Sequence, residues 1–277
     1  MAYEPKITLY FDQKPTERAE VLFESFAAGT ARVTVFSTVA GRESQVRGAI
    51  NASVAGALTR IDMQIPFGVP VTYHAEMFDS AGVSLGLTGS TMTTFNVKTT
   101  SLHNPLDPQN AVHVVMAGTA AGSISRPVPG SVLYPLNRRV GVVISGTRRG
   151  VTGVVLDCYT ATDEDADKVA AMVGGYSGNA VPVLCLRIGA DMRMRIPRPF
   201  YAAVLDPREE ARAGSKITWR MTGDEVSPPA PGIFIPLLTR ADINAFYPTR
   251  AAVNAARPTR LSVNRAYELI GAGDASA

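Results

Sequence analysis

The side chains that most often bind metals or move protons are scarce in this sequence of 277 residues. Its three histidines, His74, His103 and His113, are scattered along the chain. Polar and apolar residues alternate around His74, which points its imidazole outward from a predicted strand, and His103 falls in a predicted loop. We therefore expect solvated or locally hydrogen-bonded histidines, rather than metal ligands or general bases.

Two stretches carry part of a catalytic or metal-binding pattern. Gly175-Tyr176-Ser177-Gly178 lacks the second glycine of a nucleophile elbow at the required place, and it follows a predicted helix instead of a strand. The D-x-D-x-D run at 163–167 copies the opening of a calcium loop, which needs glycine at its sixth position and glutamate at its twelfth. Those positions hold Lys168 and Gly174. We interpret the two stretches as the end and the acidic first turn of one helix.

The common cofactor and catalytic motifs are also missing from the sequence. It has no GxxxxGK phosphate loop, no GxGxxG, no HExxH and no paired CxxC. No combination of histidine, carboxylate and nucleophile suggests hydrolysis through an activated serine. We therefore predict a protein that is not an enzyme, with no cofactor and no metal site.

The two cysteines, Cys158 and Cys185, are too few for a disulfide framework and lack metal-binding spacing. We expect reduced thiols that pack as small apolar groups. The first residues, MAYEPKITLYFDQKPTE, carry several charges and lack the apolar core of a signal peptide. No run of about 18 apolar residues predicts a membrane helix. These features suggest a soluble protein made and folded in the cytoplasm.

The composition predicts a folded, turn-rich protein. Apolar residues make up 46% and charged residues 18%, and the 24 glycines and 19 prolines favour many turns, hence β structure. The net charge of +3 includes no basic block suited to nucleic acid or membrane. Arginine outnumbers lysine 22 to 5, which fits either protein interfaces or a GC-rich coding sequence.

The first hundred residues read as short strands separated by turns. In one of them Val71, Tyr73, Ala75 and Met77 alternate with polar residues and should face a core. Short alternating strands at this spacing predict a small antiparallel sandwich over 1–100. The predicted strands are Ile7–Phe11, Ala19–Phe23, Arg32–Val39 and Val71–Phe78.

A break at Thr99–Asn110, with two prolines, reads as a linker or an ordered entry loop. Beyond it we predict a sheet crossed by one amphipathic helix near 163–173, with Thr162 as its N-cap and glycine at its end. The expected strands are Val112–Met116, Val140–Ser145, Gly153–Tyr159, Val181–Leu186, Tyr201–Leu205 and Lys216–Met221.

The last part of the chain is rich in proline. Val226–Pro236 holds four prolines, which exclude a continuous helix and argue against a central strand. A short helix capped by Thr239 should follow, and Ala251–Ala256 should form a second helix before Pro258.

One stretch resembles a known module. PFGVPVTYHAEMFDSAG (Pro66–Gly82) is similar to the penultimate strand and following turn of a fibronectin type III domain, with Val71 at the tyrosine-corner position. The resemblance implies a fibronectin III-like β-sandwich for residues 1–100. It implies no particular function, because such modules serve many roles.

A wider resemblance covers most of the chain, to the minor tail proteins of long-tailed bacteriophages that infect actinobacteria. The order of strand, Arg-Arg-Gly turn, strand, Asp-led helix and PVLCLR resembles the ring-forming domain of distal tail proteins, which shares the fold of tail tubes. The matching stretches are LHNPLDPQNAV (Leu102–Val112), SGTRRGVTGVVLDC (Ser145–Cys158), PVLCLRI (Pro182–Ile188), TWRMTGDEVSPPAPG (Thr218–Gly232) and FYPTRAAVNAA (Phe246–Ala256).

This resemblance implies a structural protein of the phage tail tip, located in the virion and made in the host cytoplasm. Residues 101–231 would form a tail-tube-like β domain and 232–277 a C-terminal interaction arm with short helices. The implied partners are further copies in a ring, a hexamer first and a trimer second, the tail tube protein, other tip or baseplate proteins and the end of the tape measure. Binding of host-surface glycan is the alternative function, and a wall-degrading enzyme is a third hypothesis.

The implied interface residues combine the two basic pairs around one predicted strand with the proline-rich segment and two aromatics near the end of the chain. They are Arg138, Arg139, Arg148, Arg149, Pro228, Pro229, Pro231, Phe234, Phe246 and Tyr247.

Overall fold

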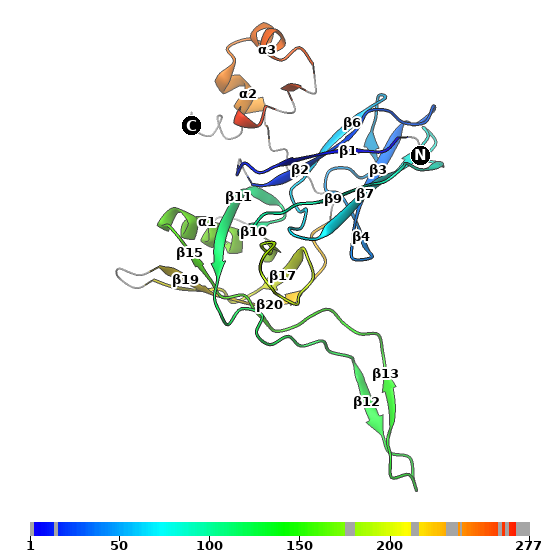
Figure 1. Cartoon of the computed structure of the whole chain (residues 1–277), viewed down its shortest axis with the longest axis vertical. Helices are drawn as coiled ribbons and strands as arrows, with labels where there is room; N and C mark the ends of the chain where they lie inside the picture. The colour runs from blue at the N-terminus through cyan, green and yellow to red at the C-terminus, as the bar shows by residue number, and fades with distance from the viewer. Residues whose placement is uncertain are drawn as a thin grey trace. The chain divides into compact units, whose positions relative to one another are not determined.

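The protein is mainly β, built from several antiparallel sheets with three short helices (Figure 1). The computed structural model describes residues 3–13, 16–174, 181–211, 216–230, 238, 240–259, 262–263 and 266–269. Internal contacts divide the chain into two compact units, each with its own apolar core. Unit 1 comprises Met1–Val97, Leu106–Ala111 and Pro229–Ala277, and unit 2 comprises Lys98–Pro105 and Val112–Pro228.

Unit 1 contains two antiparallel sheets. One has the strand order β1-β2-β6 and the other the order β4-β3-β7-β8, with β5 added to β3 and β9 to β7. The strands are β1 (Lys6–Tyr10), β2 (Arg18–Phe23), β3 (Arg32–Val39), β4 (Arg42–Gln45), β5 (Ala52–Ser53), β6 (Leu58–Asp62), β7 (Pro70–Phe78), β8 (Ser84–Leu87) and β9 (Thr91–Thr94).

Alternation along β7 builds the core of these sheets. Val71, Tyr73, Ala75 and Met77 are all buried, as the sequence pattern predicts, while the residues between them are partly exposed. His74 points to the other face, where its ring stacks on Phe36 at 5.4 Å between centroids. The period of two therefore fixes which face of the strand meets the core.

A buried hydrogen bond ties β7 to β6. The Tyr73 hydroxyl donates to Asp62 Oδ2 at 2.7 Å, and the Gln64 backbone N–H donates to Asp62 Oδ1 at 2.8 Å. Tyr73 lies two residues beyond Val71, to which the sequence comparison gives the corner position. The tyrosine thus links neighbouring strands of different sheets and satisfies a buried carboxylate.

We predict that Tyr73→Phe lowers the free energy of unfolding of the full chain by about 1–3 kcal/mol, because a buried carboxylate loses a donor. Urea titration followed by far-UV circular dichroism measures the change. Tyr159→Phe is the matched control, since the half-buried Tyr159 hydroxyl forms no hydrogen bond with any described residue. Equal stabilities for Tyr73→Phe and the unaltered protein would contradict the prediction.

Unit 2 is organised around a nine-stranded sheet that curls into a half-barrel, of which only residues 107–111, the first half of β11, belong to unit 1. Its strand order is β14-β20-β17-β16-β10-β11-β15-β19-β18. The strands are β10 (Thr100–Asn104), β11 (Asp107–Met116), β14 (Val154–Val155), β15 (Cys158–Thr160), β16 (Val183–Arg187), β17 (Phe200–Val204), β18 (Arg208–Glu210), β19 (Ile217–Arg220) and β20 (Thr222–Glu225).

The predicted break at Thr99–Asn110 is wrong, because this segment forms β10 and the start of β11. All five residues of β10 are buried, and the strand pairs with β16 in the register Ser101↔Arg187 to His103↔Cys185. His103, expected in a loop, is 0% exposed in this strand. The prolines mislead because they lie outside β10, at the turn and near the start of β11, and leave the β10 ladder intact.

The single predicted strand Gly153–Tyr159 is also wrong, because it divides at Asp157. β14 pairs with β20, whereas β15 pairs with β19. The segment that holds β14 and β15 and the segment that holds β19 and β20 therefore pair with each other twice, at one end of the nine-stranded sheet and again near its other end. At the bend, Asp157 Oδ1 accepts the Met221 N–H at 3.1 Å and Asp157 Oδ2 accepts Arg220 Nη1 at 2.8 Å. We call this arrangement the Asp157 corner. It replaces ladder hydrogen bonds where the sheet turns.

We predict that Asp157→Ala destabilises the protein by about 2–3 kcal/mol, because it leaves the buried Met221 N–H unpaired and breaks the pair with Arg220. Thermal and urea unfolding monitored by the single tryptophan, Trp219, measure the effect. Asp206→Ala is the control: among the described residues Asp206 pairs only with exposed Arg208, and such a pair contributes roughly 0–1 kcal/mol. A loss no larger than that of Asp206→Ala would contradict the role of the corner.

The helix α1 (Asp163–Gly174) packs against β10, β15 and β16. The Asp165 N–H donates to Thr162 Oγ1 at 3.1 Å, which confirms the predicted N-cap. Ala166, Val169 and Met172 are buried in the core of unit 2. The helix ends at Gly174, whose φ of 114° suits glycine. Residues 175–180, with the Gly-Tyr-Ser-Gly stretch, lie outside the described part of the chain.

Short helices follow in the C-terminal part of unit 1. They are α2 (Arg240–Phe246), α3 (Arg250–Ala256) and a 3-10 turn at Tyr267–Leu269. Thr249 caps α3, with its side chain accepting the Ala252 N–H. The predicted cap Thr239 lies outside the described residues.

Candidate interaction site

The most distinctive surface of unit 2 is a long β-hairpin, here named the arm and defined as residues 125–152. Among the described strands, β12 (Gly130–Leu133) and β13 (Val142–Ser145) pair only with each other, from Gly130↔Ser145 to Leu133↔Val142. Between these strands and the curled sheet, the two segments of the hairpin stay paired through backbone hydrogen bonds from Gly146 N–H to Pro129 O at 2.8 Å and from Arg149 N–H to Pro127 O at 3.0 Å. The arm is an extended two-stranded ribbon (Figure 1).

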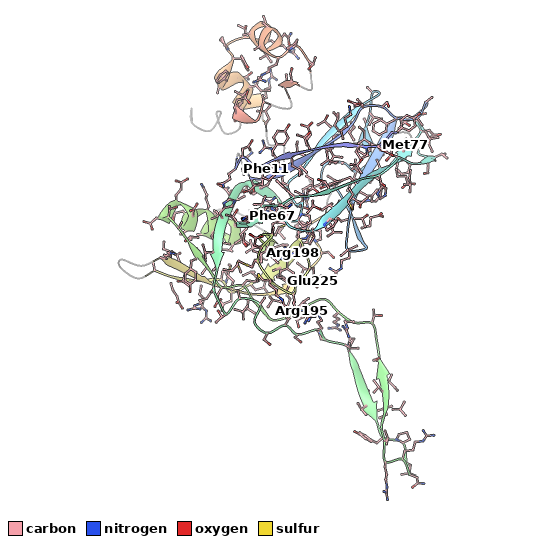
Figure 2. The ribbon with its side chains drawn as sticks, viewed as in Figure 1. Phe11, Phe67, Met77, Arg195, Arg198 and Glu225 are labelled. Carbon is pink, nitrogen blue, oxygen red and sulfur yellow. The ribbon has the colours of Figure 1, made fainter. Side chains whose placement is uncertain are left out.

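Contacts within unit 2 fix the root of the arm. The Thr152 N–H donates to Ser125 O at 3.1 Å, and the Val151 N–H donates to Glu225 Oε2 at 2.8 Å. Arg126 Nη2 donates to the carbonyl of Arg195 at 2.8 Å. Figure 2 labels Arg195 and Glu225. Strand β20 therefore anchors the root at Val151, and the segment near Arg195 anchors it at Arg126.

The arm exposes an unusual amount of apolar side chain. Nine of the 18 large hydrophobic residues exposed in the described structure lie on it, with Leu136 at 93% and Val140 at 78% exposure. Residues directly opposite in the ladder share a face, so Val132 with Val143 lie on one face and Leu133 with Val142 on the other. Both faces are apolar. The nine are Val128, Val132, Leu133, Tyr134, Leu136, Val140, Val142, Val143 and Ile144.

The charges of the arm are all positive. It carries five arginines and neither aspartate nor glutamate, whereas the rest of the chain holds 22 basic and 24 acidic residues. The guanidinium groups of Arg138, Arg139, Arg148 and Arg149 form no hydrogen bond or ion pair with any described residue. A cationic ribbon with apolar faces and free arginines has the composition of a docking surface.

The structure brings together four of the predicted interface residues and separates the others. Arg138 and Arg139 lie at the tip of the arm and Arg148 and Arg149 near its root. The apolar strand residues between them were missed by sequence reasoning, which predicted Val140–Ser145 but no partner strand. The signal was present in the sequence, because no acidic residue occurs between Asp107 and Asp157.

The other predicted interface residues lie elsewhere. Pro228 closes unit 2, and the carbonyl of Pro229 accepts Arg47 Nη2 at 2.6 Å within unit 1. Phe246 is exposed at the end of α2 and meets Tyr247 edge to face, with 5.0 Å between centroids. Pro231 and Phe234 lie outside the described residues.

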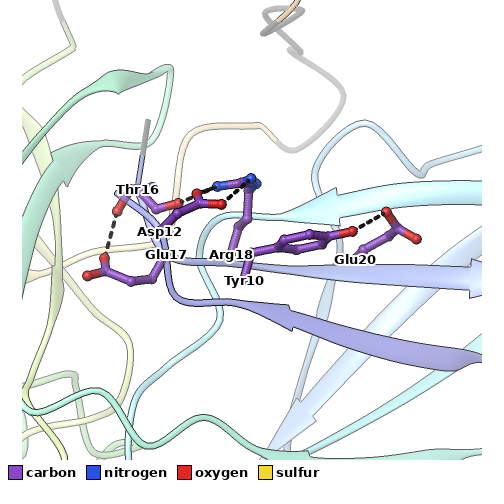
Figure 3. A network of polar contacts seen from close by, with 6 residues as sticks. All are labelled: Tyr10, Asp12, Thr16, Glu17, Arg18 and Glu20. Atoms are coloured by element: carbon purple, nitrogen blue, oxygen red, sulfur yellow. Dashed lines mark hydrogen bonds and ion pairs between the residues drawn. The ribbon is translucent and has the colours of Figure 1, made fainter. Parts of the chain in front are cut away.

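Unit 1 contains a buried cluster of charged and polar residues around Arg18 (Figure 3). Arg18, 0% exposed, pairs with Asp12, donates to Thr16 O at 3.2 Å and lies 4.8 Å from the Tyr10 ring centroid. Tyr10 in turn donates its hydroxyl to Glu20 Oε2 at 3.2 Å. Tyr10 and Arg18 are directly opposite in the β1–β2 ladder. The cluster neutralises a buried cation and ties two strands together, which is a structural role.

Nothing in the described residues resembles a metal or thiol site. No group of three histidine, cysteine, aspartate or glutamate side chains among them could hold a metal ion, and none of the described helices is long and apolar enough to cross a membrane. Both cysteines are buried thiols, as predicted. Burial, assisted by the charge of Asp157, raises the pKa of the Cys158 thiol to about 12.

We predict that the folded protein reacts with a thiol reagent at pH 8 far more slowly than the unfolded chain, because the reactive thiolate is suppressed. Titration with Ellman's reagent should detect two thiols only after addition of guanidinium chloride. Unfolding returns Cys158 to its ordinary pKa of 9.0, so this group stabilises the fold up to about pH 9 and ceases to do so by about pH 12. A rapidly reacting thiol in the folded protein would contradict this prediction.

No known protein family, no curated protein and no solved structure gives a match to this chain.

Proposed function

We propose that this protein is a structural component of a phage tail tip, a minor tail protein that forms a ring at the distal end of the tail tube and docks neighbouring tip proteins. The observation that carries this proposal is the arm. Its exposed apolar strands and free arginines suit a subunit that works through contacts with other protein chains.

The places of the matching stretches support the proposal. Leu102–Val112 spans the end of β10 and the start of β11, and Pro182–Ile188 contains β16, the neighbour of β10. Ser145–Cys158 runs from the arm through its root to the Asp157 corner, and Thr218–Gly232 contains β20. Four of the five stretches therefore include or adjoin strands of the curled sheet, whereas the fifth, Phe246–Ala256, spans the end of α2 and all of α3 in unit 1.

The architecture of each unit is compatible with the finer fold assignments. In unit 1, three strands in one sheet face a second sheet of the order β4-β3-β7-β8, which a fibronectin III-like sandwich over residues 1–100 would require. In unit 2, a curled antiparallel sheet carries one helix, as a tail-tube-like domain over 101–231 would. Residues 232–277 would form a separate C-terminal interaction segment, distinct from the arm at 125–152.

The proposed partners follow from the tail-tip assignment. They are copies of this chain in a hexamer, or secondarily a trimer, together with the tail tube protein, other tip or baseplate proteins and the end of the tape measure. The proposed location is the virion, after synthesis in the host cytoplasm. The proposal includes no catalysis, cofactor, nucleic-acid specificity or membrane insertion.

Binding of host-surface glycan is the alternative proposal and has less support. Glycan sites usually present several aromatic rings on one exposed face, as stacking platforms for sugars. In the described part of residues 1–97, Phe11 is the only aromatic among the exposed large hydrophobic side chains.

The expected result for the proposed function is that antibodies against the purified protein label one end of the tail in virions from the source lysate, seen by negative-stain electron microscopy. Image averaging of intact tails should place a closed ring there and count its subunits. Absence of the protein from purified virions, or its presence there only as monomers, would refute the proposal.

A further inference from the structure

We propose that the arm of one copy of this chain pairs with strand β18 of a second copy, and that arginines at its tip oppose glutamates on that strand. This inference rests on the self-assembly contained in the proposed function and adds the two surfaces that meet. It commits the uncovered ribbon to one occupant, another copy of the same unit.

The backbone of the arm is available for such pairing. β12 and β13 pair with no described strand except each other, so each has an outer edge with unused N–H and C=O groups. An isolated two-stranded hairpin is at best marginally stable in water, and an exposed edge is a template for adding a strand. Joining the edge of a larger sheet would give these backbone groups hydrogen-bond partners.

Strand β18 offers the matching edge. It ends the nine-stranded sheet, its three residues are exposed, and among the described strands it pairs with β19 alone. The opposite end of the sheet, β14, has only two residues, of which Val154 is buried. Of the two ends, β18 has the longer and more accessible backbone.

Charge complementarity favours pairing of the arm with β18 of a second copy over pairing with the arm of a second copy. Two arms would bring ten arginines together with no acidic residue, whereas β18 (Arg208–Glu210) carries two glutamates, Glu209 and Glu210, on opposite faces of the strand beside one arginine. The Glu209 carboxylate forms no ion pair or hydrogen bond with any described residue, and Glu210 has only a 3.4 Å contact with the half-exposed Arg220. Complementary charges fix register and partner choice at interfaces.

A charge-swap experiment tests the pairing in the full chain. Arg138→Glu with Arg139→Glu, and separately Glu209→Arg with Glu210→Arg, should each weaken self-association at least about tenfold by analytical ultracentrifugation. When the two variants are mixed, an acidic arm faces a basic β18 and a basic arm faces an acidic β18. Mixed assemblies should therefore reappear in native mass spectrometry, with the two variants alternating. All four positions are exposed, and far-UV circular dichroism checks that Glu210→Arg, which loses the contact with Arg220, is still folded.

The matched control reverses acidic charge on the same unit, away from β18. Asp163→Arg with Glu164→Arg, in the exposed first turn of α1, should leave self-association unchanged. Loss of association in this control, or no recovery on mixing the swapped variants, would overturn the assignment of β18.

Two further outcomes separate the pairing from the function on which it rests. If Arg138→Glu with Arg139→Glu self-associates as well as the unaltered protein, the pairing alone is overturned. The ring would then use other surfaces. A protein that remains monomeric but binds vesicles of anionic phospholipid or single-stranded DNA through the arm would overturn both the pairing and the self-assembly.

Discussion

The curvature of the nine-stranded sheet depends on how the chain bends at Asp157. Two antiparallel segments change direction together there, so that β14 with β20 and β15 with β19 fall at different places in one strand order. A carboxylate can accept both the Met221 N–H and the Arg220 guanidinium, which gives those donors partners where no ladder is available. Leu156 and Cys158, on either side of the bend, share one apolar core with the buried residues of α1. The position of the arm's root, which begins a few residues earlier, follows from it as well.

The two candidate features of the molecule handle charge in opposite ways. In unit 1 the buried Arg18 contacts a carboxylate, a carbonyl and an aromatic ring, which stabilise its positive charge inside the fold. In the arm four arginines have no such partner among the described residues, and the nearby side chains are apolar and exposed. The first arrangement stabilises a domain, and the second leaves binding capacity for another molecule.

Local patterns in the sequence predicted the elements whose determinants are local. Alternation identified the buried face of β7, and Thr162 with the acidic turn identified the start of α1. β10 was missed because its burial comes from β16, some eighty residues away, and because adjacent prolines suggested a loop. The division at Asp157 depends on Met221, which is 64 residues away in sequence. Of the candidate site, the arginine pairs were predicted, but their union with exposed apolar strands required the hairpin pairing.

Because a few contacts at its root attach the arm, its length can change without a change in the curled sheet. Because β12 and β13 pair with no other strand in the described part of the chain, equal insertions of two residues into both strands would preserve the ladder register and the side-chain alternation while leaving the curled sheet untouched. Related chains could therefore diverge in reach by lengthening or shortening this hairpin in even steps. The same modularity makes the segment a natural graft point, where a foreign ribbon could be exchanged without redesigning the domain that carries it.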